Sequence, residues 1–215
     1  MELGRDVMDG GSELARTGGQ GRTAARDRLL SSAYTLFSRH ATRAVGVDTI
    51  IDHARVAKKT LYTHFASKDE LIVAFLRERE EKWTRAWLQA EVRRRAATPA
   101  GRLLAIFEVF GEWFARVDFE GCSFINVMLE VTERKSPVRR ESVTQLANIR
   151  EFLGELVADA GIADADGVAR QWHILMKGSI VAAAEGDQDA AVRAAELGRL
   201  LLASHGVEVP EPTGR

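Results

Sequence analysis

The stretch Val56-Ala-Lys-Lys-Thr-Leu-Tyr-Thr-His-Phe65 decides how the first part of this 215-residue chain folds. Its apolar residues Leu61 and Phe65 stand four positions apart, so both face the same side of a helix. The preceding stretch, Val47-Asp-Thr-Ile-Ile51, shows the same kind of spacing. We therefore predict two short helices, at about 47–54 and 58–65, joined by a turn at residues 55–57.

The segments on either side complete a small domain. Before the two short helices, apolar residues recur at helical spacing over about 22–39: Leu29, Leu30, Ala33, Leu36 and Phe37. After them, Ser67-Lys-Asp-Glu70 matches a capping box, in which the serine hydroxyl and the glutamate carboxylate each accept a free N–H group. We expect this cap to open a long helix that reaches about residue 97. Residues 22–68 thus form a three-helix helix-turn-helix domain.

The charges are unevenly distributed along the chain. Between Arg22 and Lys68, nine Lys and Arg residues stand against three acids, a net charge of +6, whereas the whole chain carries −1. The remaining residues therefore carry −7. A basic domain on an otherwise acidic chain indicates a module that binds a polyanion, and a chance cluster on a solvated surface is the alternative.

A helix-turn-helix presents the first residues of its second helix to base edges in the major groove of DNA, and neighbouring side chains contact phosphates. The candidate DNA contacts are Lys58, Lys59, Thr60, Tyr62, His64 and Lys68. We expect the first three to face the bases and the others to lie where phosphates pass. The alternatives are solvated lysines, a Thr60 that only caps its helix and a half-buried Tyr62.

The spacing of apolar residues predicts helices in the rest of the chain as well. Apolar residues recur every three or four positions, and Gly121, Pro137, Gly161 and Gly186 separate the segments. We expect further helices at about 100–117, 123–133, 137–160, 165–185 and 188–204. The fold class is therefore all-α with about nine helices. Its parts are a disordered arm at 1–21, the helix-turn-helix domain at 22–68, a helical body at 69–205 and a disordered tail at 206–215.

The body holds all four tryptophans and is the candidate site for a small ligand. Aromatic residues one helical turn apart describe first of all a core, but an aromatic cavity with a few polar groups also suits an apolar or amphipathic molecule. Asn126, on an otherwise apolar segment, would orient the polar end of that ligand. The candidate ligand-binding residues are Trp87, Phe110, Trp113, Phe124 and Asn126.

The segments quoted above, with Ser67-Lys-Asp-Glu-Leu71, closely resemble the DNA-binding signature of TetR-family transcription regulators. With the length and the helix count, the resemblance covers about residues 22–205. Gly121-Cys-Ser-Phe-Ile-Asn126 also resembles a segment of one branch of the family. The chain departs from the family pattern at Ala41-Thr42, at Arg55, where glycine is usual, and at Ala66. If the backbone at Arg55 is left-handed, the missing glycine costs on the order of 1 kcal/mol.

The resemblance implies a DNA-binding domain joined to a body that binds a ligand and forms a homodimer. The last two helices, at about 165–205, are rich in small and branched residues and resemble the dimer interface of the family. The implied function is a transcriptional regulator that binds a palindromic double-stranded DNA operator, most simply a repressor released by a small apolar or amphipathic effector. An activator and a regulator without a ligand stay open as alternatives.

Other functional classes find no support in the sequence. Motifs of common enzyme classes (His-Glu-x-x-His, Gly-x-Ser-x-Gly, the P-loop and Gly-x-Gly-x-x-Gly) are missing, so we expect neither an enzyme nor a cofactor or metal site. No apolar run approaches the roughly 18 residues of a membrane span, which indicates a cytoplasmic protein. The single cysteine, Cys122, rules out an intramolecular disulfide. It is either a buried thiol or a helix-start thiol with a lowered pKa.

Overall fold

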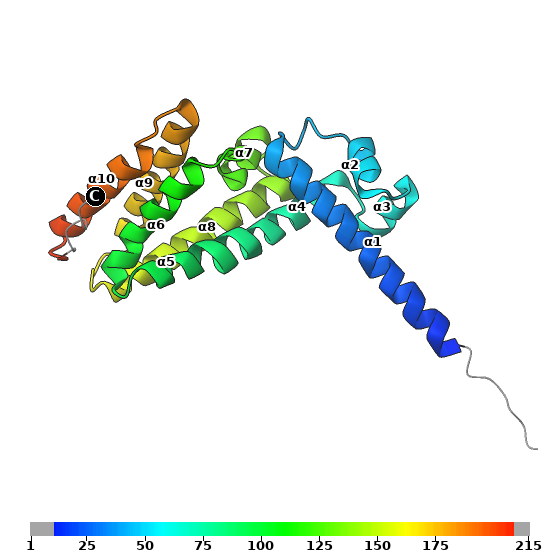
Figure 1. Ribbon diagram of the computed structural model, residues 1–215, viewed down its shortest axis with the longest axis horizontal. Coiled ribbons are helices and arrows are strands. Elements are labelled where there is room, and N and C mark those ends of the chain that lie inside the picture. The colour runs from blue at the N-terminus through cyan, green and yellow to red at the C-terminus, as the bar shows by residue number, and fades with distance from the viewer. Residues whose placement is uncertain (1–10, 209–215) are drawn as a thin grey trace, which may run out of the picture. The chain divides into compact units, whose positions relative to one another are not determined.

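The computed structural model describes residues 11–208, with side chains from residue 23 onward (Figure 1). Over this range the chain is all-α, and no strand occurs in it. The helices are α1 (Gly11–Arg39), α2 (Val47–Ala54), α3 (Lys58–His64), α4 (Lys68–Arg79), the π-helix η1 (Glu80–Gln89), α5 (Ala90–Arg95), α6 (Pro99–Phe114), α7 (Ser123–Glu130), α8 (Pro137–Asp159), α9 (Ala165–Glu185) and α10 (Ala190–Ser204). Because α4, η1 and α5 follow one another without a break, the described residues form nine helical segments, as predicted.

The first helix begins earlier than predicted. The sequence suggests a start at about residue 22, after a disordered arm, whereas α1 begins at Gly11. The glycines at 18, 19 and 21, which suggest a break, each cost a helix only about 1 kcal/mol, and a helix already formed gains a backbone hydrogen bond with each added residue. Residues 1–10 of the predicted arm and 209–215 of the predicted tail lie outside the described residues.

The chain forms two compact units, divided between Ile72 and Val73. The predicted boundary, after Lys68, lies slightly earlier. In the first unit, α1 packs against α2 and α3, and the two short helices pack against each other. The apolar core of this unit includes Leu29, Ala33, Phe37, Ile50, Leu61 and Phe65.

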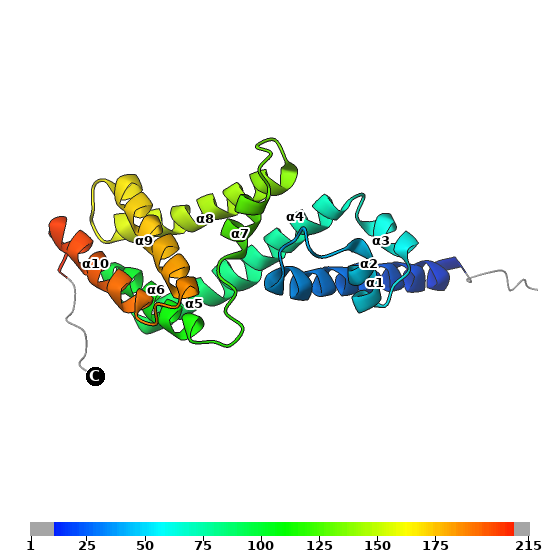
Figure 2. The ribbon, with the colours of Figure 1, turned by 90° about the horizontal axis from the view of Figure 1, so that it is seen from above.

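The second unit is built around α6 and α8. Helix α8 packs against α6, α7 and α9, and α10 packs against α6 and α9 (Figure 2). Phe107 and Phe110 of α6 are buried, as is Trp172 of α9. The rings of Phe107 and Trp172 lie 5.5 Å apart between centroids, so aromatic contacts join α6 to α9 inside this unit.

Side-chain caps hold the first turns of α4 and α6 in place. Ser67 Oγ accepts the N–H of Glu70 at 3.1 Å, and the Glu70 carboxylate accepts the N–H of Ala66 at 2.6 Å. The predicted capping box at the start of α4 is therefore confirmed. Thr98 caps α6 in the same way, since its Oγ1 accepts the N–H of Gly101 at 3.1 Å. These bonds satisfy N–H groups that the first turn of a helix leaves without an internal partner.

Helix α10 approaches Trp172 closely because Gly198 carries no side chain. A Cβ atom at position 198 would lie 2.7 Å from the Trp172 ring and 3.3 Å from the Phe107 ring. Both rings are buried in a closely packed interior, so neither has room to move away. The packing of α10 on α6 and α9 thus depends on glycine at this position.

Replacing Gly198 with alanine should lower the free energy of unfolding by about 1–3 kcal/mol, because the added methyl group overpacks this core. Gly154 in α8 is the matched control, since a Cβ atom there would have no heavy atom within 4 Å. Gly154→Ala should raise the free energy of unfolding by up to about 1 kcal/mol through helix propensity. Urea titrations measure both changes, and a Gly198→Ala variant as stable as the wild type would contradict the close approach.

Candidate nucleic-acid interface and ligand site

The turn between α2 and α3 sets the angle of the helix-turn-helix. Arg55 has a left-handed backbone (φ 53°, ψ 51°), and it is the one non-glycine residue with positive φ among those described. The N–H groups of Arg55 and Val56 donate to the carbonyls of Asp52 and Ile51, both at 3.1 Å, and so close the end of α2. The backbone at Arg55 is therefore left-handed, as considered above. Because arginine stands there in place of glycine, this conformation costs on the order of 1 kcal/mol of folding free energy.

Helix α3 presents several of the predicted DNA contacts to solvent. Lys58 and Lys59 in its first turn are exposed, and Tyr62 is 49% exposed although its ring is large and apolar. Thr60 and His64 are half-buried beside them. The two lysines and Tyr62 are therefore accessible to a DNA duplex.

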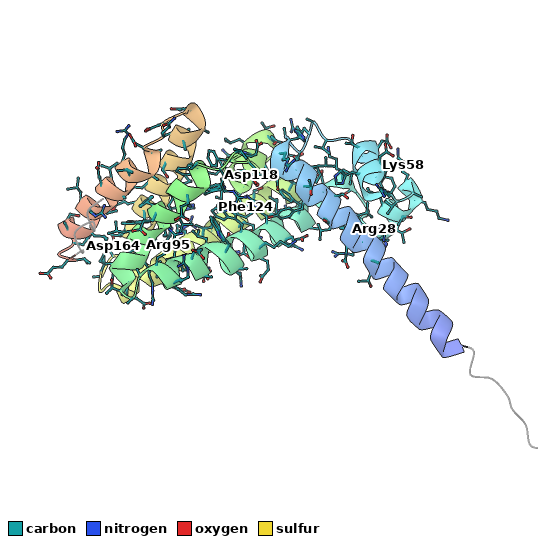
Figure 3. All side chains as sticks on the ribbon, viewed as in Figure 1. Arg28, Lys58, Arg95, Asp118, Phe124 and Asp164 are labelled. Atoms are coloured by element: carbon teal, nitrogen blue, oxygen red, sulfur yellow. The ribbon has the colours of Figure 1, made fainter. Side chains whose placement is uncertain are left out.

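Lys58 is paired within the protein. The Nζ of Lys58, a residue labelled in Figure 3, lies 3.0 Å from Oδ1 of Asp48 in α2. This hydrogen bond, with the attraction between the two charges, raises the Lys58 pKa. Both side chains are exposed to solvent, so the pair adds little to stability. It does neutralise one of the two lysines at the start of α3. This pair was not predicted from the sequence, although the acid in the first turn of α2 could have indicated it.

The start of α4 is a second feature that suits phosphate. Lys68 is the first residue of α4 and is half-buried. Ser67 and Glu70 hold the first turn in place through the capping box. The N–H groups at such a helix end point outward and favour an anion. This position suits the phosphate contact predicted for Lys68.

In the second unit, three of the five predicted ligand-binding residues gather around Trp83. The Trp83 ring centroid lies 5.5 Å from that of Trp87, 6.2 Å from Phe110 and 5.0 Å from Trp113. Trp83 and Trp87 are half-buried, whereas Phe110 is fully buried. Trp83 is not among the predicted ligand-binding residues, although its position one helical turn before Trp87 could have indicated it.

The other two predicted residues lie on α7 and have different surroundings. Phe124 is buried (Figure 3). Asn126 is exposed, and its Nδ2 donates to the carbonyl of Glu120 at 3.1 Å. The Asn126 amide therefore bonds to the backbone of the loop that precedes α7. The role predicted for Asn126, to orient a ligand from inside the body, does not fit this position.

Two titratable side chains of the second unit are buried in their neutral forms. Burial raises the pKa of the Cys122 thiol, although two backbone N–H groups of α7 act in the opposite direction. Of the two alternatives for Cys122, the buried thiol therefore agrees with the structure. Burial also lowers the pKa of His173 to about 4, and the charges of Lys177 and Arg150 add to this shift. Neither group supplies a charge near pH 7.

Comparison with known proteins gives two family matches. Residues 29–75 match the family of bacterial regulatory proteins described as the tetR family, and residues 99–197 match the tetracyclin repressor-like C-terminal domain. The chain belongs to the TetR family. The first match covers the helix-turn-helix and the start of α4, and the second covers most of the second unit, so the resemblance to the TetR family is confirmed.

Individual TetR-family proteins are similar to this chain over different shares of its length. The HTH-type transcriptional activator FasR of Mycolicibacterium smegmatis is 35% identical over 112 residues, which are 52% of this chain and 50% of that protein. The chain thus matches about half the length of this curated relative. A TetR-family regulator of Streptomyces coelicolor has a TM-score of 0.77 at 27% identity, covering 85% of this chain and 96% of that one. A putative TetR regulator of Streptomyces avermitilis has a TM-score of 0.75 at 28% identity, covering 86% and 99%.

These likenesses make the chain a DNA-binding transcriptional regulator of the TetR family and not an enzyme. Within residues 11–208, no helix combines the length and apolar character that crossing a membrane requires. The same part of the chain has no group of three or more His, Cys, Asp or Glu side chains placed to hold a metal ion.

Replacing Arg55 with glycine should raise the free energy of unfolding by about 1 kcal/mol, or the melting temperature by about 2–4 °C, because glycine adopts the left-handed backbone without strain. Gly186 is the control with the opposite sign, since its φ of 105° would strain alanine. Thermal unfolding of Arg55→Gly and Gly186→Ala tests this pair. An Arg55→Gly variant that melts at or below the wild-type temperature would show that the turn carries no such strain.

Proposed function

We propose that this regulator binds a palindromic operator in the cytoplasm as a homodimer and leaves it when a small apolar or amphipathic effector binds the second unit. The observation that carries DNA binding is the accessible face at the start of α3, where Lys59 and Tyr62 are exposed. A twofold dimer suits two half-sites that lie about one helical turn, ~34–36 Å, apart.

The residues of the interface have three roles in this proposal. Lys59 and Thr60 read base edges, whereas Tyr62, His64 and Lys68 contact phosphates and set the register. Lys58 has a third role because Asp48 holds it. The Asp48 carboxylate repels phosphate and occupies the lysine, so this pair restrains binding to DNA of any sequence.

Replacing Asp48 with asparagine should therefore strengthen binding to every duplex and steepen the dependence of log K on log salt by about one unit, since Lys58 becomes available to a phosphate. Lys68→Ala should have the opposite effect, with a slope lower by about one unit. Lys59→Ala should instead change the preference at one base pair of each half-site. Fluorescence anisotropy on operator and random duplexes over a range of salt concentrations measures all three.

The matched control for these variants is Lys135→Ala, an exposed lysine in the loop before α8. It removes the same charge from the second unit and should leave both the affinity and the salt slope unchanged. If the three variants in the helix-turn-helix region behave like this control, the proposed interface is wrong.

The proposed dimer surface consists of the outer faces of α9 and α10. TetR-family regulators are dimers. Large apolar side chains are exposed on these two helices: Ile174 (62%), Val181 (49%), Leu197 (52%) and Leu200 (68%). Ala191 and Ala194 are buried within the protomer, so the small residues of α10 pack on the chain's own core. The exposure of these apolar residues is the support for a dimer through residues 165–205, in which they would be buried against a second copy.

Leu200→Glu should produce monomers that keep their helix content, because the charge would be buried without a partner at the proposed interface. Val143→Glu is the matched control, since Val143 is 48% exposed on α8, outside that surface. Sedimentation velocity at micromolar concentration and circular dichroism test both variants, and footprint titration reports the operator affinity that monomers should lose. A monomeric wild type, or a dimeric Leu200→Glu variant, would exclude this surface.

An effector site in the second unit is supported by the half-buried rings of Trp83 and Trp87 beside the enclosed Phe110. A screen of apolar compounds for release of operator DNA tests this part of the proposal. By linkage, operator DNA should weaken the binding of a releasing compound by the same factor.

Activation is the second candidate function. FasR, the 35% identical relative, is a transcriptional activator. Footprinting on the flanking genomic DNA separates the two functions, because a repressor site overlaps the promoter and an activator site lies upstream of it.

A further inference from the structure

Arg26 of α1 lies over an aromatic ring at the end of α3. Its guanidinium carbon is 5.2 Å from the ring centroid of Phe65, a distance at which the positive charge is attracted to the face of the ring. Phe65 ends α3 and is 1% exposed, whereas Arg26 is exposed. The arginine therefore contacts a buried ring of the helix-turn-helix and is at the same time accessible from solvent.

The ring holds Arg26 without cancelling its charge. An aromatic ring attracts a cation through its quadrupole but carries no net charge. Among the residues that the structure describes, no carboxylate pairs with Arg26. Lys58 differs, since Asp48 neutralises it at a distance of 3.0 Å. Arg26 is therefore both held in position and available to an anion, whereas Lys58 must first leave Asp48.

The contact with Phe65 brings this charge close to the proposed phosphate contacts. His64 directly precedes Phe65, and Lys68, the first residue of α4, follows three positions later. The Cα atoms of Phe65 and His64 are thus about 3.8 Å apart, and those of Phe65 and Lys68 at most about 11 Å apart. Arg26 therefore belongs to the part of the first unit where α3 ends and α4 begins.

A guanidinium group at this position suits phosphate in particular. Arginine presents five N–H donors in one plane, and these match the oxygens of a phosphate group. The attraction to the ring uses none of these donors, and within the described part of the chain Arg26 makes no hydrogen bond through them. Phosphates recur about every 3.4 Å along each strand of duplex DNA, so charges that lie close together on the protein can contact neighbouring phosphates.

We propose that Arg26 is a further phosphate contact of the DNA interface and that Phe65 holds it in position for the duplex. Its guanidinium binds the backbone of DNA of any sequence, beside the phosphates assigned to His64 and Lys68. This inference rests on the proposed DNA interface, and it adds α1 to α3 and α4 as a helix that contacts the duplex.

Arg28, labelled in Figure 3, is a matched control on the same helix. It is also an exposed arginine, and no carboxylate of the described residues pairs with it. Two positions along an α-helix correspond to a rotation of about 200°, so Arg28 points to the opposite side of α1 from Arg26. Removal of either arginine changes the net charge equally, but Arg26 is the one beside Phe65.

The test measures binding of the full-length protein to random-sequence duplex DNA over a range of salt concentrations by fluorescence anisotropy. Arg26→Met keeps an unbranched stem next to Phe65 and removes the charge. It should lower the dependence of log K on log salt by about one unit and weaken binding about tenfold at roughly 0.1 M salt, because one phosphate contact is lost. Arg28→Met should leave both values unchanged.

Arg26→Lys separates the charge from the packing of the side chain on the ring. Lysine keeps the charge and its attraction to the ring, so the salt slope should stay at the wild-type value. The melting temperatures of both Arg26 variants should lie within about 2–4 °C of the wild type, since the contact is exposed. A slope lowered as much in Arg26→Lys as in Arg26→Met would assign the effect to packing on Phe65 and overturn the inference.

Lys68→Ala, measured in parallel, separates failure of this inference from failure of the proposed interface. If Lys68→Ala lowers the slope and Arg26→Met does not, Arg26 is not a contact and the interface stands without it. If Arg28→Met lowers the slope as much as Arg26→Met, the effect comes from the general charge of α1, and the inference is wrong. If none of these variants changes the slope, both the inference and the proposed interface fail.

Discussion

The long helix through α4, η1 and α5 depends at its start on the cap formed by Ser67 and Glu70. The cap holds the beginning of this helix because Ser67 Oγ accepts the N–H of Glu70 and the Glu70 carboxylate accepts the N–H of Ala66. Lys68 follows the cap directly and is the first residue of α4. The proposed phosphate contact of Lys68 therefore relies on these two hydrogen bonds.

Polar groups are treated in opposite ways in the two units. In the helix-turn-helix, Lys58 and Asp48 satisfy each other at the surface, where water and salt weaken the pair and DNA can compete for the lysine. In the second unit, the hydroxyl of Thr84 is shut away from water and has no partner in the protein. The ion pair between Lys58 and Asp48 can be broken at small cost in free energy. Thr84, in contrast, carries the free-energy cost of a buried hydroxyl that makes no hydrogen bond.

Local signals account for the parts of the structure that the sequence predicted well. The capping box, the apolar spacing of Leu61 and Phe65 and the strained position of Arg55 each depend on residues a few positions apart. The features that escaped prediction depend on contacts outside that range or on backbone geometry. Asp48 and Lys58 meet across the turn, and Trp83 meets Trp113 from another helix. Asn126 turns to a loop carbonyl, and residue types alone do not distinguish η1 from an ordinary α-helix.

The glycine contact beneath α10 also determines which side chains lie on the proposed dimer surface. Gly198 must face Trp172, so the helix has one rotational setting, and Leu200 is left on the outside. The outer residues take no part in fixing that setting. A substitution at one of them would alter the proposed dimer surface and leave the contact between Gly198 and Trp172 intact.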